Sequence, residues 1–327
     1  MGEFELLARL RERLPTAPSR VLVGSGDDAA VTVPGGATAT SIDALVDGVH
    51  FRRDTATLTQ IGRKALATAL SDLAAMGAEA GEAYVAVGVP PDLDEDGCLE
   101  LFDGIVALAA ATGTTLAGGD VTRAPALTLA VTVVGHALAP EYLVTRAGAM
   151  PGDALVLTGE IGGAAAGLLL LERPELAAAV DAATAAQLRR RQLDPTPRLA
   201  AGQALAAAGA RAMIDLSDGL GGDAGHLARA SGAGVRIEAA TLPLAPGVTE
   251  IAAAAGRDPL ELAAIGGEDY ELLAALAPER LDEALRTAPA DGPDGLARVG
   301  EVTAGEEVEI RLPGGGILAP AGFDQLG

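Results

Sequence analysis

The sequence predicts two domains that each combine helices with strands, an α+β domain followed by an α/β domain. The chain has 327 residues, too many for one ordinary core and suited to two domains of about 150 residues each. Segments with the apolar spacing of helices alternate with segments of strand composition along the whole chain. Turn formers cluster at residues 148–153, so we place the domain boundary there, between residues 1–148 and 149–327.

The first half predicts a few helices and one compact sheet. Apolar residues recur at helical spacing in three segments, and short runs rich in Val, Thr and Ile predict strands. The helices are expected at residues 3–14, 59–76 and 93–112, and the strands at residues 21–23, 38–43, 84–89 and 127–134.

The second half repeats the alternation with Ala-rich and Leu-rich helices. Gly162-Gly163 introduces one helix, Gly219 precedes another, and further helices are expected at residues 175–191 and 197–208. Pro313 and the three glycines after it predict a hairpin turn. The strands are expected at residues 154–157, 212–215, 235–238, 271–276 and 308–312.

The composition excludes several classes of function. Hydrophobic residues make up 49% of the chain and aromatic residues 2%, so Ala, Leu, Val and Ile must build the core. The formal net charge of -22 disfavours nucleic-acid binding, which needs a basic surface. The sequence contains no uninterrupted apolar run of about 20 residues, the length that a membrane span needs. The single Cys98 and an amphipathic start unlike a signal peptide favour the cytoplasm.

One absence restricts how the protein can bind ATP. Lys64 is the only lysine, and the sequence has no G-x-x-x-x-G-K-[ST] run. P-loop enzymes need that lysine on the nucleotide phosphates, and protein kinases need a strand lysine. A protein of this composition that binds ATP must neutralise the phosphates by another route, for which metal ions are the obvious candidates.

Six short segments place small residues beside carboxylates where a strand or helix is expected to end. Glycine lets backbone amides approach an anion closely, and the short Asp side chain holds its carboxylate near the main chain. Mg²⁺ prefers oxygen ligands and commonly joins one or two carboxylates to phosphate groups. The segments are Gly26-Asp27-Asp28, Ser41-Ile42-Asp43, Ser71-Asp72, Gly118-Gly119-Asp120, Asp215-Leu216-Ser217-Asp218-Gly219 and Gly266-Gly267-Glu268-Asp269.

Any one of these segments is explained more simply as a helix cap or a turn. Asp215 and Asp218 are more informative, because they precede a helix N-terminus whose free N–H groups suit phosphate. Asp72 lies inside an apolar helix, where a carboxylate is costly unless it is paired or metal-bound. The six segments together favour a distributed Mg²⁺ and phosphate site, and His50 is the best ligand contact among three histidines.

Read in order, these segments resemble the thiamine-monophosphate kinase family of the aminoimidazole-ribonucleotide-synthetase-like superfamily of ATP-binding proteins. The match runs nearly end to end. The acidic turns are shared across the superfamily, whereas HF at 50–51, SDLAAMGA and GGEDYEL together are typical of this kinase family. The matching runs are GDDAAV (26–31), DGVHF (47–51), LSDLAAMGA (70–78), GGD (118–120), RAGAMPGD (146–153), DPTPR (194–198), IDLSDGL (214–220), GGEDYEL (266–272) and GFD (322–324).

The resemblance implies a subunit that dimerises through its N-terminal sheets, closing a barrel across the two-fold axis, with ATP between the two domains. The implied Mg²⁺ ligands are Asp28, Ser41, Asp43, Asp72, Asp120, Asp215 and Asp218, with Ile42 through its backbone. The implied ATP contacts are Gly119, Asp120, Arg146 and Ser217, and the implied thiamine monophosphate contacts are His50, Glu268 and Phe323. The residues implied to carry the transfer are Asp43, Asp120, Asp218 and Arg146.

The implied reaction moves the γ-phosphoryl group of ATP onto thiamine monophosphate, giving thiamine diphosphate and ADP. The chain departs from the family pattern at Ala69, where Asn is usual, and at Met150, where Lys is frequent; neither is an implied ligand. Two alternatives stay open. Another superfamily enzyme is disfavoured, because a selenophosphate synthetase needs a reactive Cys and a Lys near the start, and the hydrogenase-maturation protein needs a C-terminal Cys. A non-catalytic scaffold would bind metal without nucleotide turnover.

Overall fold

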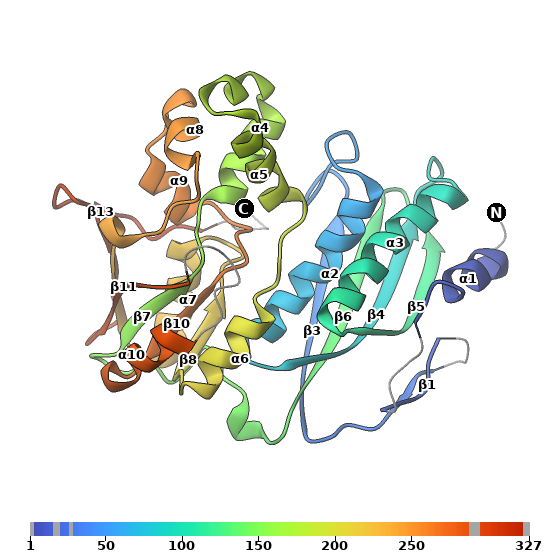
Figure 1. The fold of residues 1–327 in the computed structure, drawn as a ribbon, viewed down its shortest axis with the longest axis horizontal. Helices are drawn as coiled ribbons and strands as arrows, with labels where there is room; N and C mark the ends of the chain where they lie inside the picture. Colours follow the sequence, from blue (N-terminus) through green and yellow to red (C-terminus); the bar gives the residue numbers. More distant parts are fainter. Residues whose placement is uncertain (1–2, 16–19, 26–28, 288–294, 323–327) are drawn as a thin grey trace. The chain divides into compact units, whose positions relative to one another are not determined.

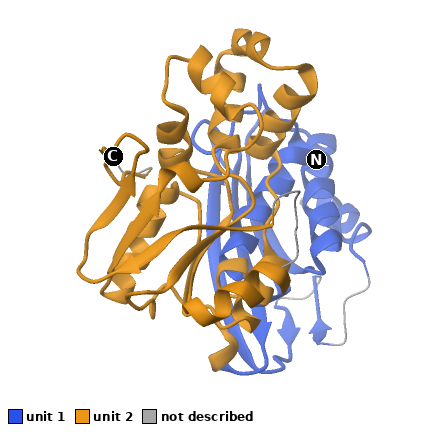
Figure 2. Cartoon of the chain, turned by 60° about the vertical axis from the view of Figure 1, so that its left-hand side comes forward, with its two compact units in different colours: residues 1–73, 78–140 blue, residues 74–77, 141–327 orange. Residues whose placement is uncertain are grey.

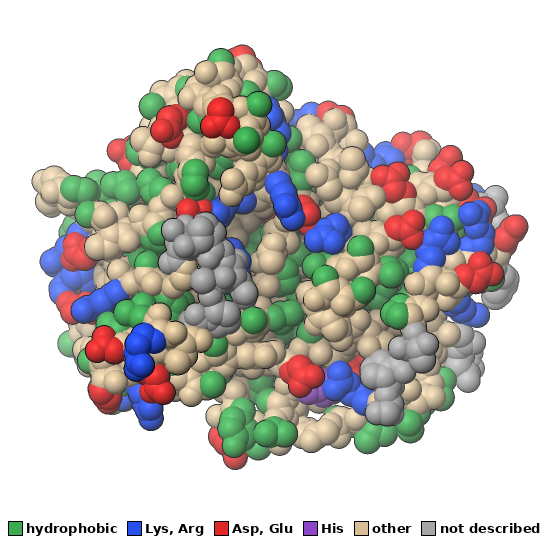
Figure 3. All heavy atoms as spheres, in the orientation of Figure 1, with side chains coloured by type: hydrophobic (Ala, Val, Ile, Leu, Met, Phe, Trp, Pro, Cys, Tyr) green, Lys and Arg blue, Asp and Glu red, His purple; other side chains and the backbone are tan. Residues whose placement is uncertain are grey.

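The computed structural model describes residues 3–15, 20–25, 29–287 and 295–322. The described chain divides into two compact units, residues 1–73 with 78–140 and residues 74–77 with 141–327 (Figure 2). Among these described residues, no helix is long and apolar enough to cross a membrane. On the face shown in Figure 3, acidic side chains are scattered among basic ones and do not form one large patch.

The first unit is built on a four-stranded sheet in the order β3-β6-β4-β5. Its strands are β3 (Ala37–Val46), β4 (Glu79–Val89), β5 (Thr115–Arg123) and β6 (Thr128–Ala137). β4 and β5 run parallel and are joined by helix α3 (Glu95–Thr112), whereas β6 is antiparallel to both of its neighbours. Helix α1 (Glu3–Arg11) and the short strands β1 (Val21–Val23) and β2 (Val31–Thr32) precede the sheet.

The two faces of this sheet differ in exposure. Leu129, Val131 and Val133 alternate along β6 and are fully buried, because α3 and helix α2 (Leu58–Ala75) cover that face (Figure 1). Most side chains on the opposite face are half-buried or exposed, and Ile42 of β3 is 67% exposed, whereas His136 and Glu82 on that face are buried and paired with each other. Side-chain burial therefore alternates from residue to residue along these strands, as expected for a sheet with one buried face.

The second unit is built on a seven-stranded sheet in the order β13-β12-β9-β11-β7-β10-β8. Only the β9–β12 pair is parallel, so the sheet is mixed. The strands are β7 (Ala154–Thr158), β8 (Ala212–Asp215), β9 (Gly234–Glu238), β10 (Leu272–Leu276), β11 (Leu296–Thr303), β12 (Val308–Arg311) and β13 (Ile317–Leu318).

Helices cover both faces of this second sheet. Leu155 and Leu157 of β7 pack in the same apolar cluster as Leu227 of α7 (Leu220–Ser231). Val156 points the other way, into a cluster with Leu205 of α6 (Leu199–Ala207) and Ala284 of α10 (Pro278–Thr287). Burial on both faces explains why the central strands are continuous apolar runs without polar alternation.

A separate layer of helices packs around its own apolar cluster. Its members are α4 (Gly163–Glu172), the 3-10 helix η2 (Pro174–Ala179), α5 (Ala182–Leu193), α8 (Val248–Ala254) and α9 (Pro259–Ile265). The two remaining 3-10 helices are η1 (Pro140–Tyr142) and η3 (Ala239–Thr241). This layer matters for the site because α4 and α5 supply partners to the segment between α9 and β10.

The structure confirms most predicted elements and corrects two. Gly118-Gly119-Asp120 was expected at a turn but lies inside β5, where Gly119 pairs with Val85. Glycines resemble a turn in sequence, yet a Cβ on Gly119 would lie 2.2 Å from the Val85 carbonyl oxygen, so the close strand pairing requires glycine. The predicted helix over 175–191 is two helices, because Asp181 caps α5 by accepting hydrogen bonds from the N–H groups of Ala183 and Thr184.

Candidate functional site

The first unit brings three of the predicted polar side chains together at its sheet edge. Ser41 and Asp43 are two residues apart on β3 and therefore share one face. Asp72 reaches them from α2, and its carboxylate accepts a hydrogen bond from the Ser41 hydroxyl. Burial, together with the negative charge of Asp72, raises the pKa of Asp43 to about 6. Ile42 points to the opposite, exposed face.

Asp120 and Gly119 lie on the other edge of the same sheet. The strand register aligns Asp43 with Val131, Val131 with Val85 and Val85 with Gly119. Three strand spacings separate β3 from β5, which is about 14 Å. Asp120 is next to Gly119 and its side chain points to the opposite face from Asp43. Within one chain, the structure does not bring Asp120 to the Asp43 and Asp72 pair.

His50 lies in the turn that follows β3. Its Nδ1 accepts a hydrogen bond from the backbone N–H of Val46, 3.1 Å away, so the neutral ring carries its proton on Nε2. The ammonium group of Lys64 is 3.4 Å from the backbone oxygen of His50. The only lysine of the chain therefore supports this turn and is buried.

In the second unit, the loop between β8 and α7 gathers three carboxylates. Asp215 ends β8 and is buried, and Asp218 follows three residues later. Asp223 of α7 reaches back so that one carboxylate oxygen accepts from the N–H groups of Asp218 (3.1 Å) and Gly219 (3.0 Å). Burial, followed by the charges of Asp215 and Asp218, raises the pKa of Asp223 to about 8. Asp223 was not among the predicted site residues, although an acid in the first turn of a helix is a capping signal.

The segment Gly266–Glu271 runs beside that loop and is joined to it through the backbone. The N–H of Glu268 donates to the carbonyl oxygen of Ser217 at 2.8 Å, and the N–H of Tyr270 donates to that of Leu216 at 2.9 Å. Glu268 and Tyr270 have φ values of 66° and 51° and are the non-glycine residues with positive φ in the described chain. Each left-handed residue costs on the order of 1–2 kcal/mol, so the surrounding contacts must hold the segment in this shape.

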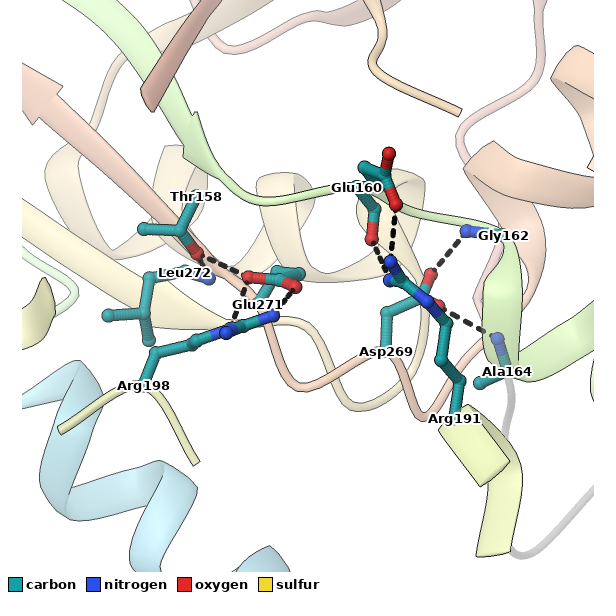
Figure 4. A network of polar contacts seen from close by, with 9 residues as sticks. All are labelled: Thr158, Glu160, Gly162, Ala164, Arg191, Arg198, Asp269, Glu271 and Leu272. Carbon is teal, nitrogen blue, oxygen red and sulfur yellow. Dashed lines mark hydrogen bonds and ion pairs between the residues drawn. The ribbon is translucent and has the colours of Figure 1, made fainter. Parts of the chain in front are cut away.

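Polar contacts on both sides of the segment provide that hold (Figure 4). The Asp269 carboxylate accepts from the N–H groups of Gly162 (2.7 Å) and Ala164 (3.1 Å), at the start of α4. Glu271 accepts from Nε of Arg198 at 2.8 Å and from the hydroxyl of Thr158 at 2.7 Å. Burial raises the pKa of Asp269 to about 7 and raises that of Glu271.

Of the remaining predicted contacts, Arg146 lies before β7 and is held at the C-terminal end of α7. The hydroxyl of Ser231, at the end of α7, donates to the backbone oxygen of Arg146 (3.2 Å) and accepts from the N–H of Ala149 (3.1 Å), which holds residues 146–149. Gly322 packs on Gly222 at the start of α7, where a Cβ added to Gly222 would lie 3.0 Å from the Gly322 Cα. Asp28 and Phe323 lie outside the described residues, so two predicted contacts have no structural description.

The donor sets fit Mg²⁺ as it usually binds in proteins. No group of three or more His, Cys, Asp or Glu side chains in the described residues forms a preassembled metal cage. Mg²⁺ does not need one, because it keeps several waters and takes one or two carboxylates together with substrate phosphates. Asp43 and Asp72 form one such pair, and the charge of Asp72 contributes to the raised pKa of Asp43, so a cation between them would relieve repulsion. Asp215 and Asp218 offer a second pair.

Comparison with known proteins identifies the class to which this fold and site belong. The family model of the AIR synthase related protein N-terminal domain matches residues 26–137, and that of the AIR synthase related protein C-terminal domain matches residues 150–313. The chain is therefore an AIR synthase related protein of two domains.

Close relatives narrow the class to one family. The thiamine-monophosphate kinase of Mycobacterium tuberculosis (strain ATCC 25618 / H37Rv) is 40% identical over 276 residues, covering 84% of this chain and 80% of the relative. The crystal structure of thiamine-monophosphate kinase from Stenotrophomonas maltophilia K279a superposes with a TM-score of 0.82 at 36% identity, covering 96% of this chain and 97% of that one. AaThiL complexed with AMPPCP and TMP has a TM-score of 0.76 at 28% identity, covering 98% and 94%. The chain belongs to the thiamine-monophosphate kinase family.

Proposed function

We propose that this protein transfers the γ-phosphoryl group of ATP to the phosphate of thiamine monophosphate, with Mg²⁺ ions held by its acidic loops. Family membership supports the reaction. The single observation that supports this chain's own part in it is the hydrogen bond from Glu268 N–H to the Ser217 oxygen. That bond joins the residue expected to contact thiamine monophosphate to the residue expected to contact ATP, which suits direct transfer between the two substrates.

The electrostatic task is to bring two polyanions together. The acceptor phosphate is already largely ionised at neutral pH, because its second pKa is about 6, so no strong general base is needed. Repulsion between phosphates about 4 Å apart is several kcal/mol per charge pair at an effective dielectric of about 20. Mg²⁺ at Asp43, Asp72, Asp215 and Asp218 would supply the offsetting charge when bound, and Arg146 would add a fixed cation.

We also propose that the active form is a homodimer that pairs through the N-terminal sheets. The face of the four-stranded sheet opposite α2 and α3 carries half-buried or exposed Thr, Ala and Val side chains along β3 and β6, together with the 67% exposed Ile42. Asp120 lies on this face, away from Asp43 of the same chain. Size-exclusion chromatography with light scattering tests the dimer. Because ATP is the donor, we place the reaction in the cytoplasm.

One assay tests the reaction against its alternatives. The protein is incubated with MgATP and thiamine monophosphate, and the products are separated by chromatography. Equimolar thiamine diphosphate and ADP are expected. ADP without thiamine diphosphate would indicate another ATP-dependent enzyme of the same class, and metal binding without either product would indicate a scaffold.

A further inference from the structure

The segment Gly266–Glu271 is held from both sides by side chains that have no place in the reaction described above. Glu268 faces the amide of Gln192, which donates to the Glu268 carboxylate. Asp269 binds the start of the adjacent helix α4. The positive φ values of Glu268 and Tyr270 flank Asp269, so these contacts must hold a backbone conformation that non-glycine residues rarely adopt.

Asp269 caps the N-terminus of α4, which has no capping side chain of its own. The N-cap residue of α4 is Gly162, which has φ 79° and no side chain to accept a hydrogen bond. Asp269 supplies the missing acceptors from a distant part of the sequence, with one oxygen on the N–H of Gly162 and the other on that of Ala164. A carboxylate bound by two amides at a helix N-terminus is fixed in place. The residue before it, Glu268, is therefore fixed as well.

The loop between β8 and α7, which carries Ser217, is held by contacts of its own. Asp223 holds the N–H groups of Asp218 and Gly219 without help from Asp269. The Leu216 N–H donates to the carbonyl oxygen of Glu271 at 2.8 Å, and Glu271 is held by Arg198. Loss of the hydrogen bonds of Asp269 should therefore displace Glu268 more than it displaces the loop that carries Ser217.

We propose that Asp269 and Gln192 are positioning residues that hold the Glu268 carboxylate where the enzyme binds thiamine monophosphate. Asp269 fixes the backbone through the start of α4, and Gln192 orients the carboxylate directly. The inference rests on the proposed function, because it assigns Glu268 to the acceptor.

The test measures KM for each substrate in Asp269→Asn and Gln192→Met. Asn offers a single acceptor and places an NH₂ group against a backbone N–H, so it cannot replace both Asp269 contacts. Met keeps the shape of Gln192 and removes only its hydrogen bonding. Each variant is expected to raise KM for thiamine monophosphate by about tenfold or more, the effect of losing a hydrogen bond to a charged group. KM for ATP should change by less than about twofold.

A double-mutant cycle separates positioning from general support of the fold. If Asp269 acts through Glu268, then Asp269→Asn adds less than about twofold to KM for thiamine monophosphate in a Glu268→Ala background. Asp94→Ala serves as the control, because Asp94 caps α3 of the other unit through the N–H of Gly97. That variant should lose thermal stability and keep both KM values.

The outcomes distinguish a failure of the proposed function from a failure of the positioning role alone. If the wild-type protein forms no thiamine diphosphate, the proposed function fails and the inference fails with it. If the wild type is active but the variants raise both KM values equally, or if the Asp269→Asn effect persists in full without the Glu268 carboxylate, only the inference is overturned. Should Asp269→Asn fail to fold, Gln192→Met with its own Glu268→Ala cycle decides the matter.

Discussion

At the scale of single residues, the candidate site is a set of carboxylates placed closer together than an ordinary protein surface would place them. Asp43 and Asp72 face one another in the first unit, and Asp223 lies beside Asp215 and Asp218 in the second. The raised pKa values of Asp43 and Asp223 have two causes, burial and like charge. Burial and like charge both destabilise the folded protein when no cation is bound. Binding of a cation would restore that stability.

Asp43→Asn is expected to separate stability from activity. Removing the charge relieves both the burial of a carboxylate and its repulsion by Asp72, so the metal-free protein should become more stable by on the order of 1 kcal/mol after allowance for solvent screening. The turnover number should fall by about 100-fold or more, because a phosphoryl-transfer metal loses a ligand. Urea unfolding in EDTA and steady-state kinetics in Mg²⁺ measure the two effects. Asp96→Asn is the control, since that side chain is 89% exposed; equal losses in both variants would exclude a special role for Asp43.

Asp269 should give the protein a measurable dependence of stability on pH. Burial raises its pKa from 3.8 to about 7, so the folded chain binds more protons than the unfolded chain between those values. The stabilising contribution is complete below about pH 4 and is lost as the pH rises through about 7. The groups that act on Asp269 are Glu271 and Arg191.

The measurement compares wild type with Asp269→Asn by urea unfolding at pH 5 and pH 8. The stability advantage of the wild type is expected to shrink by roughly 1–3 kcal/mol between the two pH values, since one pKa unit corresponds to about 1.4 kcal/mol. A constant difference would mean that Asp269 is ionised throughout this range.

At the scale of elements, glycines determine how closely the two helices of the first unit approach. A Cβ on Gly62 of α2 would lie 2.0 Å from the Leu101 carbonyl oxygen, and one on Gly104 of α3 would lie 2.1 Å from that of Thr59. The helices therefore meet backbone to backbone. This contact keeps α2, which carries Asp72, in register with the sheet edge that carries Asp43.

Gly104→Ala is expected to destabilise the protein by about 1–3 kcal/mol, because overpacking outweighs the better helix propensity of alanine. Gly314→Ala is the matched control, since an added Cβ there meets no atom within 4 Å. Thermal or urea unfolding of both variants decides the point. Similar stabilities of the two would show that α2 and α3 can separate without cost.

The same elements show what could be predicted from sequence. Helix and strand periodicity located α2, α3, β7 and β8 to within a few residues, because each has one clear pattern of burial. The strand β5 was not predicted, since Gly118 and Gly119 resemble a turn and their pairing with β4 depends on a neighbour distant in sequence. Asp269 was recognised within an acidic turn, but its capping of α4 was not predictable, because it joins segments 105 and 107 residues apart.

At the scale of the whole molecule, charge determines how this chain can bind a nucleotide. The formal net charge is -22 and Lys64 is the only lysine, and Lys64 is buried against the backbone of His50. Substrates with several negative charges approach a protein that repels them. The long-range field therefore opposes binding, and short-range cations must reverse it.

Removal of Mg²⁺ should consequently abolish most ATP binding while leaving the fold intact. Affinity for a non-hydrolysable ATP analogue, measured by calorimetry, is expected to fall by at least about tenfold in EDTA, since each unneutralised charge pair near 4 Å costs several kcal/mol at an effective dielectric of about 20. Mn²⁺ should restore binding because it accepts the same oxygen ligands. KCl at matched ionic strength should not, because screening weakens repulsion without bridging carboxylate to phosphate. Affinity that survived EDTA unchanged, with the far-UV circular dichroism also unchanged, would contradict a Mg²⁺-bridged site and require the arginines to hold the phosphates alone.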